Sequence, residues 1–232
     1  MAAHRVTLSP QTARTLQRIL LKWGRSHYQD YPWRSADEPW HALVAELLLQ
    51  RTRAANVVPV YTAFVKKFPT PEKLARARLS TIEQIIYPLG LIWRAPWLKK
   101  LGQALSISNG EIPTDIEGLK QLPGVGDYIA AAWLGFHGGK RAVIVDANVV
   151  RWLCRLIGEP YDGETRRQAW LIELADRCTP QRAWKDYNYA VLDFTMTVCT
   201  TRPQCEVCPI GPQRCAYGAT HLAQKTPRRS TG

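Results

Sequence analysis

Four cysteines stand close together near the carboxyl end of the chain. They follow one another as Cys199, Cys205, Cys208 and Cys215, with five, two and six residues between them. Disulfides are rare in intracellular proteins, so thiols grouped at such short range indicate a metal centre. Tetrahedral zinc and an iron–sulfur cubane both use four thiolates, and the spacing alone does not choose between them. Cys154 and Cys178 stand apart on apolar stretches and are expected to be ordinary buried thiols.

Two acidic residues, Asp146 and Glu46, are candidates for a functional role. Asp146 directly precedes the apolar stretch that starts at Ala147, and it is a natural N-cap for a helix there. Glu46 is the one acid in the apolar run PWHALVAELLLQRT. A buried carboxylate is costly unless it is paired or functional, and burial raises its pKa toward a protonated, donating state. The alternatives are that Asp146 only caps its helix and that Glu46 is partly exposed.

The segment 116–136 reads as two helices joined by LPGVG. Pro123 stops the first helix, and Gly124 and Gly126 permit positive φ angles and close approach. Free N–H groups at the start of the second helix can hold a phosphate oxygen, which grips a nucleic-acid backbone without reading bases. A turn made only for packing can also be rich in glycine.

The charge of the chain favours a polyanionic partner. Lys and Arg number 31 against 19 Asp and Glu, so the net charge is +12 and the isoelectric point is about 9.7. Each phosphate that a basic side chain neutralises releases counterions. Together with the glycine-rich turn, the charge predicts binding to DNA.

The elements that must position these residues are helices. Apolar residues recur at spacings of three and four, which predicts an all-α fold. Pro and Gly punctuate the expected helices, which are 10–24, 39–51, 54–67, 71–77, 80–87, 94–107, 115–121, 127–136, 147–157, 164–177 and 185–197. The one strand-like run, 142–145, is too short for a sheet. No apolar run suits a membrane span or a secretory signal, so we expect no membrane partner and an intracellular protein.

The order of these motifs resembles a known family. LPGVG is followed, twenty positions beyond Gly126, by VDANVVR. This pattern is similar to the helix-hairpin-helix (HhH-GPD) DNA glycosylases, a superfamily with endonuclease III, the adenine glycosylases and the thymine–DNA mismatch glycosylases. The resemblance runs from about Tyr31 to Tyr217. It implies base-excision repair of double-stranded DNA. Apart from the resemblance, we expect a monomer in the cytoplasm, associated with a prokaryotic nucleoid.

The resemblance assigns roles to the two carboxylates and to Tyr128. In the family, the Asp after the hairpin is essential for breaking the N-glycosidic bond, because its charge stabilises an oxocarbenium-like sugar. Asp146 occupies that position, and Glu46 matches a residue that faces the flipped base. Relatives that also cut the strand have a lysine where this chain has Tyr128. The resemblance therefore implies a monofunctional enzyme that leaves an abasic site, with Tyr128 either lining the base pocket or packing.

Other positions match DNA contacts of the family. Gln50 matches the residue that fills the hole left by the extruded nucleotide, and Leu91 matches a second wedge. Such plugs keep a flipped base out of the stack, since flipping costs about a few kcal/mol. Arg51 is expected at a phosphate. The hairpin contributes Leu122, Gly124, Val125 and Gly126.

The resemblance also selects the metal. The cysteines of the family hold a [4Fe–4S] cluster, with six, two and five residues between ligands where this chain has five, two and six. The total span is unchanged and the middle pair has moved by one position. This departure bears on loop geometry more than on ligation.

Three features favour thymine or uracil opposite guanine as the substrate. Ala147 stands where adenine glycosylases generally have Gly, Asp193–Phe194 replaces their Leu-Gly pair, and the chain ends soon after the cysteines without a recognition domain for 8-oxoguanine. The alternatives are adenine opposite guanine or 8-oxoguanine, and oxidised pyrimidines. A catalytically silent DNA-binding module and a redox protein are alternatives of other classes.

The resemblance further implies two helical lobes with a DNA cleft between them. We expect a six-helix lobe with the hairpin at 28–140, and a cluster lobe built from 1–27 and 141–220. The segment 221–232 is expected to be a disordered basic tail.

Overall fold

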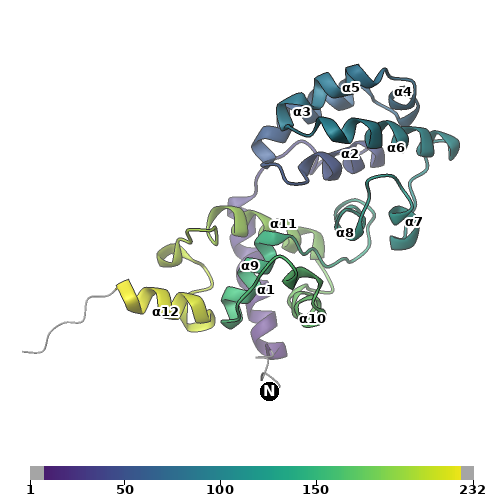
Figure 1. Ribbon diagram of the computed structural model, residues 1–232. Coiled ribbons are helices and arrows are strands. Elements are labelled where there is room, and N and C mark those ends of the chain that lie inside the picture. The colour runs from purple at the N-terminus through teal and green to yellow at the C-terminus, as the bar shows by residue number, and fades with distance from the viewer. Residues whose placement is uncertain (1–7, 226–232) are drawn as a thin grey trace, which may run out of the picture. The chain divides into compact units, whose positions relative to one another are not determined.

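The computed structural model of the chain describes residues 8–225, and this range contains helices and no strand (Figure 1). The predicted all-α class is confirmed. The chain divides into two compact units. The hairpin unit is Asp30–Ala142, and the cysteine unit combines the chain up to Gln29 with the chain from Val143 onward. From the sequence, we expected the hairpin lobe at 28–140 and the cluster lobe at 1–27 and 141–220.

The hairpin unit is built around α2, which is largely apolar and carries one buried acid, Glu46. Its helices are α2 (Pro39–Leu49), α3 (Ala54–Lys67), α4 (Pro71–Ala75), α5 (Leu79–Ile86), α6 (Ala95–Ile107), α7 (Ile116–Lys120) and α8 (Asp127–Phe136), with 3-10 turns η1 (Tyr87–Leu89) and η2 (Ile92–Arg94). Every residue from Ala42 to Leu48 is buried. The indole N–H groups of Trp40 and Trp133 donate to the carbonyls of Phe68 and Pro39, at 3.0 and 3.2 Å, and so fix the helix among its neighbours.

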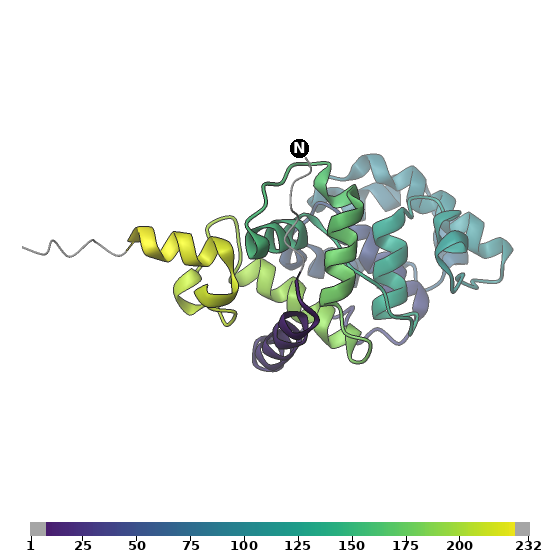
Figure 2. The same ribbon diagram turned by 90° about the horizontal axis from the view of Figure 1, so that it is seen from below.

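The cysteine unit joins the first helix of the chain to its last third. Its helices are α1 (Pro10–His27), α9 (Ala147–Ile157), α10 (Ala169–Cys178), α11 (Trp184–Thr197) and α12 (Ala216–Lys225), with 3-10 turns η3 (Thr165–Arg167), η4 (Cys205–Val207) and η5 (Pro212–Arg214). Helices α1 and α11 lie side by side (Figures 1 and 2). Leu16 and Leu20 of α1 are fully buried in the core of this unit. Cys154 and Cys178 lie in the same core as free thiols, and burial raises their pKa values to about 11 and about 12.

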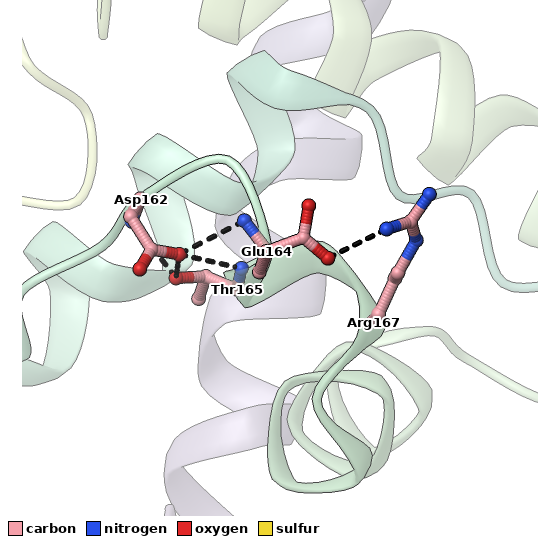
Figure 3. A network of polar contacts seen from close by, with 4 residues as sticks. All are labelled: Asp162, Glu164, Thr165 and Arg167. Atoms are coloured by element: carbon pink, nitrogen blue, oxygen red, sulfur yellow. Dashed lines mark hydrogen bonds and ion pairs between the residues drawn. The ribbon is translucent and has the colours of Figure 1, made fainter.

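The helix predicted over 164–177 is wrong at its start. Asp162 accepts the N–H groups of Glu164 and Thr165 and the hydroxyl of Thr165, each at 2.9 Å (Figure 3). These bonds cap the turn η3, which Arg167 and Glu164 brace by an ion pair at 2.6 Å. Gln168 is then extended, and α10 begins one residue later. Local capping by a short polar side chain therefore replaces the first helical turn.

Two further expectations are corrected. Helix α2 ends at Leu49, whereas the apolar pattern ran to 51, because Gln50 is extended and Arg51 has a φ of 58°. The predicted tail 221–232 is helical in its first part, since α12 continues to Lys225. The ring of Tyr217 stacks on His221 with 5.4 Å between centroids, which supports that helix. Residues 226–232 lie outside the described part.

Over the described range, no helix is both long enough and apolar enough to cross a lipid bilayer.

The contact of α1 with α11 predicts a stability effect at Gly24. A methyl group at this position would collide with the Cβ of Ala190. The change Gly24→Ala is expected to lower the free energy of unfolding by about 1–3 kcal/mol, although alanine favours helix by about 1 kcal/mol. Urea unfolding measures the difference. Gly163→Ala is the control, because a methyl group there meets open space; equal stability of the two variants would contradict the prediction.

Candidate functional site

The hairpin turn presents backbone donors at the start of α8. Gly124 has a φ of 83°, a conformation that favours glycine, as expected. Gly126 does not, since its φ is −103° and its ψ −177°, and it serves as the extended N-cap residue of α8. Within residues 8–225, the N–H groups of Gly124 and Gly126 donate to no other group. A methyl group on Gly126 would meet nothing within 4 Å, so the fold itself gives no reason for glycine there. Two free donors at a helix start suit an anion.

Val125 and Leu122 shape this turn. Val125 donates its N–H to the carbonyl of Leu122 at 3.1 Å, and its side chain is 6% exposed. Leu122 packs against the core of the unit. Any contact of these two residues with DNA remains a prediction.

A pocket beside the hairpin gathers three of the residues predicted to touch DNA. Gln50, Leu91 and Gly124 line it together, and its other lining residues are Leu47, Leu48, Ile86, Arg94, Trp97, Leu98 and Pro123. Arg94 is buried beneath it and donates from Nη1 to the carbonyl of Leu47 at 2.9 Å. The side chain of Arg51 is exposed. Its backbone has the left-handed conformation, with a φ of 58°, which is uncommon for residues other than glycine.

Glu46 is buried in the hairpin unit, at 4% exposure. Burial raises the pKa of its carboxyl to about 8, and the charge of Arg34 opposes that shift. The Nε2 of His137 lies 3.9 Å from Oε1, with both side chains buried. The carboxyl is thus protonated at neutral pH and is able to donate a hydrogen bond. Glu46 does not line the pocket of Gln50, and Tyr128 packs half-buried against the core.

Asp146 is held by a chain of hydrogen bonds at the start of α9. Its Oδ1 accepts the N–H of Val149 at 2.7 Å, which makes it the N-cap that the sequence predicts. Its Oδ2 accepts from the amide of Asn148 at 2.9 Å, and the amide oxygen of Asn148 accepts from Arg151 at 2.9 Å. Arg151 also donates to the carbonyl of Cys199, from Nε at 3.1 Å and from Nη2 at 2.9 Å. The carboxylate therefore has a fixed orientation, and it is half-buried.

The four clustered cysteines line one pocket of the cysteine unit. Cys199, Cys205, Cys208 and Cys215 share it with apolar side chains that include Phe194, Val198 and Ile210. Within residues 8–225, no three His, Cys, Asp or Glu side chains are arranged around a single metal ion. A zinc ion needs its thiolates at one centre, whereas the irons of a cubane are separate and each takes its own thiolate. The four thiols are therefore candidate ligands of a metal centre.

Arg155 braces the loop that carries these cysteines. Its guanidinium lies 3.7 Å from the sulfur of Cys199 and donates to the carbonyl of Thr201 at 3.1 Å. The same group lies over the ring of Tyr217, 4.7 Å from its centroid. The N–H of Gly218 points at the sulfur of Cys215, at 3.4 Å. Positive charge and N–H donors around the sulfurs suit thiolates that bind metal.

Sequence reasoning had missed the partners of the acids. Asn148 and Arg151 belong to the VDANVVR motif, so the sequence marked them as candidates. It did not show that they connect Asp146 to the carbonyl of Cys199. Arg34 precedes Glu46 by twelve residues and His137 follows it by 91, and neither lies in α2, so only the fold brings them to the carboxyl.

Comparisons with known proteins agree with this geometry. A family profile described as "HhH-GPD superfamily base excision DNA repair protein" matches residues 44–172. A thymine/uracil-DNA glycosylase of Pyrobaculum aerophilum is 40% identical over 207 residues, which are 85% of this chain and 89% of that protein. The structure of a thermostable thymine-DNA glycosylase aligns with a TM-score of 0.84 and 31% identity, covering 90% of this chain and 98% of the other. A non-covalent endonuclease III–DNA complex aligns at 0.81 and 25%, covering 94% and 100%.

The burial of Glu46 predicts a pH-dependent stability. The folded state keeps the carboxyl proton up to about pH 8, whereas an unperturbed glutamate releases it near 4.5. The neutral carboxyl contributes its full stabilisation below pH 4.5, where it is protonated in both states. This contribution is lost as the pH rises through the folded-state pKa of about 8. Wild type should therefore lose stability relative to Glu46→Gln over this window, by up to about 1.4 kcal/mol per pH unit.

Urea unfolding at several pH values checks this expectation. Glu111→Gln, an exposed position of the same unit, is the matched control and should track wild type. A stability difference between wild type and Glu46→Gln that stays constant with pH would show that the carboxyl is not held neutral.

Proposed function

The chain belongs to the HhH-GPD superfamily of base excision DNA repair proteins, and we propose that it is a DNA glycosylase that removes thymine or uracil from opposite guanine. The observation that carries the proposal is the orientation of Asp146, with both oxygens held at the start of α9. A thymine/uracil-DNA glycosylase and a thymine-DNA glycosylase are 40% and 38% identical to this chain, whereas adenine DNA glycosylases are 32–34% identical, which supports the choice of base. Double-stranded DNA is the substrate, and one copy of the chain supplies every residue that the proposal uses.

Asp146 acts on the sugar. As the bond between C1′ and the base nitrogen breaks, its electron pair leaves with the base and positive charge develops on the sugar ring. A carboxylate that is already oriented stabilises this charge without reorganising. Water then adds to C1′, and Asp146 takes the proton that the water loses. The Asn148 amide keeps the carboxylate in place during this exchange.

Glu46 acts on the departing base. Its carboxyl is neutral at physiological pH because it is buried, so it has a proton to donate to an oxygen or nitrogen of the base. The charge of Arg34 favours the carboxylate that remains after donation. Gln50 and Leu91 line one pocket at the hairpin and fill the space from which the nucleotide has been extruded.

Strand cleavage is absent from the proposed reaction. A lyase step needs an amine that attacks C1′ and forms a Schiff base. Tyr128 stands two residues beyond Gly126, where that amine would have to be, and a phenol forms no Schiff base. The product is therefore an intact strand with an abasic site.

The hairpin and the cysteines serve binding and structure. The free N–H groups of Gly124 and Gly126 hold a phosphate oxygen of the backbone at the start of α8. Cys199, Cys205, Cys208 and Cys215 would hold a [4Fe–4S] cluster that stabilises the loop between α11 and α12. This chain's own residues carry out every step of base release.

The proposed substrate is tested by single-turnover excision on four duplexes. Each duplex contains one T·G, U·G, A·G or A·8-oxoguanine pair. We expect base release from T·G and U·G, with strand breaks only after alkali, because no lyase amine is present. Release of adenine instead would reassign the protein to the adenine branch of the superfamily. Strand breaks without alkali, together with borohydride trapping, would contradict the monofunctional mechanism.

The role of Asp146 is tested in the same assay. Asp146→Asn keeps the N-cap geometry but removes the charge, and it is expected to slow base release by about a hundredfold or more while mismatch binding persists. Asp162→Asn is the matched control, because Asp162 caps a different turn of the same unit. Wild-type excision by Asp146→Asn would show that another group stabilises the sugar.

The cofactor proposal predicts a composition that chemical analysis can measure. Protein purified without oxygen should contain about four irons and four acid-labile sulfides per chain, with visible absorbance. Cys208→Ser should lower the iron content and the melting temperature, whereas Cys178→Ser, in the core, should leave the iron unchanged. Stoichiometric zinc without sulfide would overturn the proposal.

A further inference from the structure

Two tryptophans of the hairpin unit, Trp93 and Trp97, leave about half of their side chains exposed to solvent. The chain has nine tryptophans, and Trp93 and Trp97 are the two whose side chains are exposed, at 51% and 47%. Their neighbours Tyr87 and Ile92 are exposed as well, at 68% and 39%. A cluster of large apolar side chains at a protein surface is an indication of binding, because their burial against a partner is favourable.

The two rings form one rigid unit, which we call the aromatic pair. They meet edge to face, with 4.9 Å between centroids and an angle of 89°. The buried guanidinium of Arg94 lies over the ring of Trp93 at 5.0 Å, and the same group donates to the carbonyl of Leu47. The Trp93 indole is therefore held against the buried Arg94, while about half of the side chain stays exposed. A ring that is already fixed loses little entropy when a ligand stacks on it.

The aromatic pair adjoins the residues proposed to hold the opened duplex. Trp97 lines the same pocket as Gln50, Leu91 and Gly124. A methyl group on Gly124 would lie 3.9 Å from Cε3 of Trp97, so the indole packs against the turn that presents the free N–H groups. The pair is thus continuous with the proposed DNA contacts.

The charge around the aromatic pair suits a polyanion rather than an apolar partner. The segment from Gln84 to Gly110 contains no acid and three basic residues, Arg94, Lys99 and Lys100. Arg51, exposed at the end of α2, is close enough for its charge to lower the pKa of Arg94 after the larger effect of burial. Lys99 and Lys100 follow Trp97 within α6, and aromatic rings combined with basic side chains match the chemistry that binds unpaired nucleobases, which stack on aromatic side chains while cations hold the phosphates.

We propose that Trp93 and Trp97 form a stacking platform for a nucleobase that loses its partner when the duplex opens. This inference rests on the proposed function for the place of DNA, and it adds a binding site that reads the unpaired state of a base. A base in an intact pair is stacked on its own neighbours and cannot use the platform. The platform therefore strengthens binding to the opened duplex more than to paired DNA.

The direct test uses a duplex in which 2-aminopurine stands opposite a tetrahydrofuran abasic analogue. The fluorescence of this unpaired purine is quenched when it stacks. The full-length protein should quench it, and Trp93→Ala and Trp97→Ala should restore the signal. Because base–aromatic stacking contributes roughly 1–3 kcal/mol per base, each variant should weaken binding to this duplex by about 5- to 100-fold. Binding to the fully paired duplex should change by less than about threefold.

Three further variants separate stacking from a structural role. Trp93→Phe and Trp97→Phe retain a stacking face and should keep most of the quenching. Ile107→Ala removes an exposed apolar side chain at the far end of the same helix, α6, and should behave as wild type. Equal losses on the opened and the paired duplex, or unchanged quenching by the alanine variants, would overturn the platform. Binding of wild type to anionic lipid vesicles that Trp93→Ala abolishes, with DNA binding intact, would assign the pair to a membrane instead.

The test does not depend on catalysis, because the abasic analogue contains no base to excise. A protein that quenches the purine through Trp93 but releases no base from any mismatch would retain the platform and lose the proposed reaction. A protein that excises thymine with unchanged quenching in all variants would retain the reaction and lose the platform.

Discussion

The buried guanidinium of Arg151 is the contact on which the cysteine unit depends. An arginine taken out of water is costly unless its donors are satisfied, and here they reach Asn148 at the start of α9 and the carbonyls of Thr195 and Cys199 at the end of α11. One side chain thus connects the helix that begins at Asp146 with the loop that begins at the first clustered cysteine. A shift of that loop would move Asn148 and, through it, the carboxylate. This connection gives the cysteines a physical role at the candidate site even though they lie outside its chemistry.

The hairpin unit depends on a comparable arrangement around α2. The last carbonyls of a helix have no partner within it, and Arg94 satisfies the one at Leu47. Helix α2 ends two residues later, so Gln50 and Arg51 leave the helical path at a defined place. The neighbours of Glu46 in α2 are apolar and buried, so its carboxyl is shielded from water. This burial raises the pKa of the carboxyl and favours its protonated form. Position and protonation of the candidate residues therefore follow from the packing of one helix.

The sequence was sufficient for the helices whose apolar stripes are long, and for the N-cap at Asp146, because these depend on local spacing. It failed where a side chain or a tertiary contact overrides that spacing. Asp162 caps a turn and delays α10, Gly126 is extended although the turn is rich in glycine, and the last part of α12, from residue 221, was expected to be a tail. The pairing of Glu46 with Arg34 and His137 could not be predicted from the sequence, since Arg34 lies twelve positions before Glu46 outside its helix and His137 lies 91 positions after it. The sequence also did not predict that Trp93 and Trp97 are exposed, because large apolar side chains are expected in a core.

The discontinuity of the cysteine unit has a consequence for how the chain is made. The hairpin unit is contiguous and ends at Ala142, so all of its contacts are available once about three-fifths of this chain has been synthesised. Helix α1 is synthesised first, but its partner α11 begins only at Trp184. At roughly 5–20 residues per second, the apolar face of α1 waits on the order of ten seconds or more for the surface that buries it. Within this chain, the unit that carries Asp146 is thus completed after the hairpin unit, and Leu16 and Leu20 lack the α11 side of their core until then.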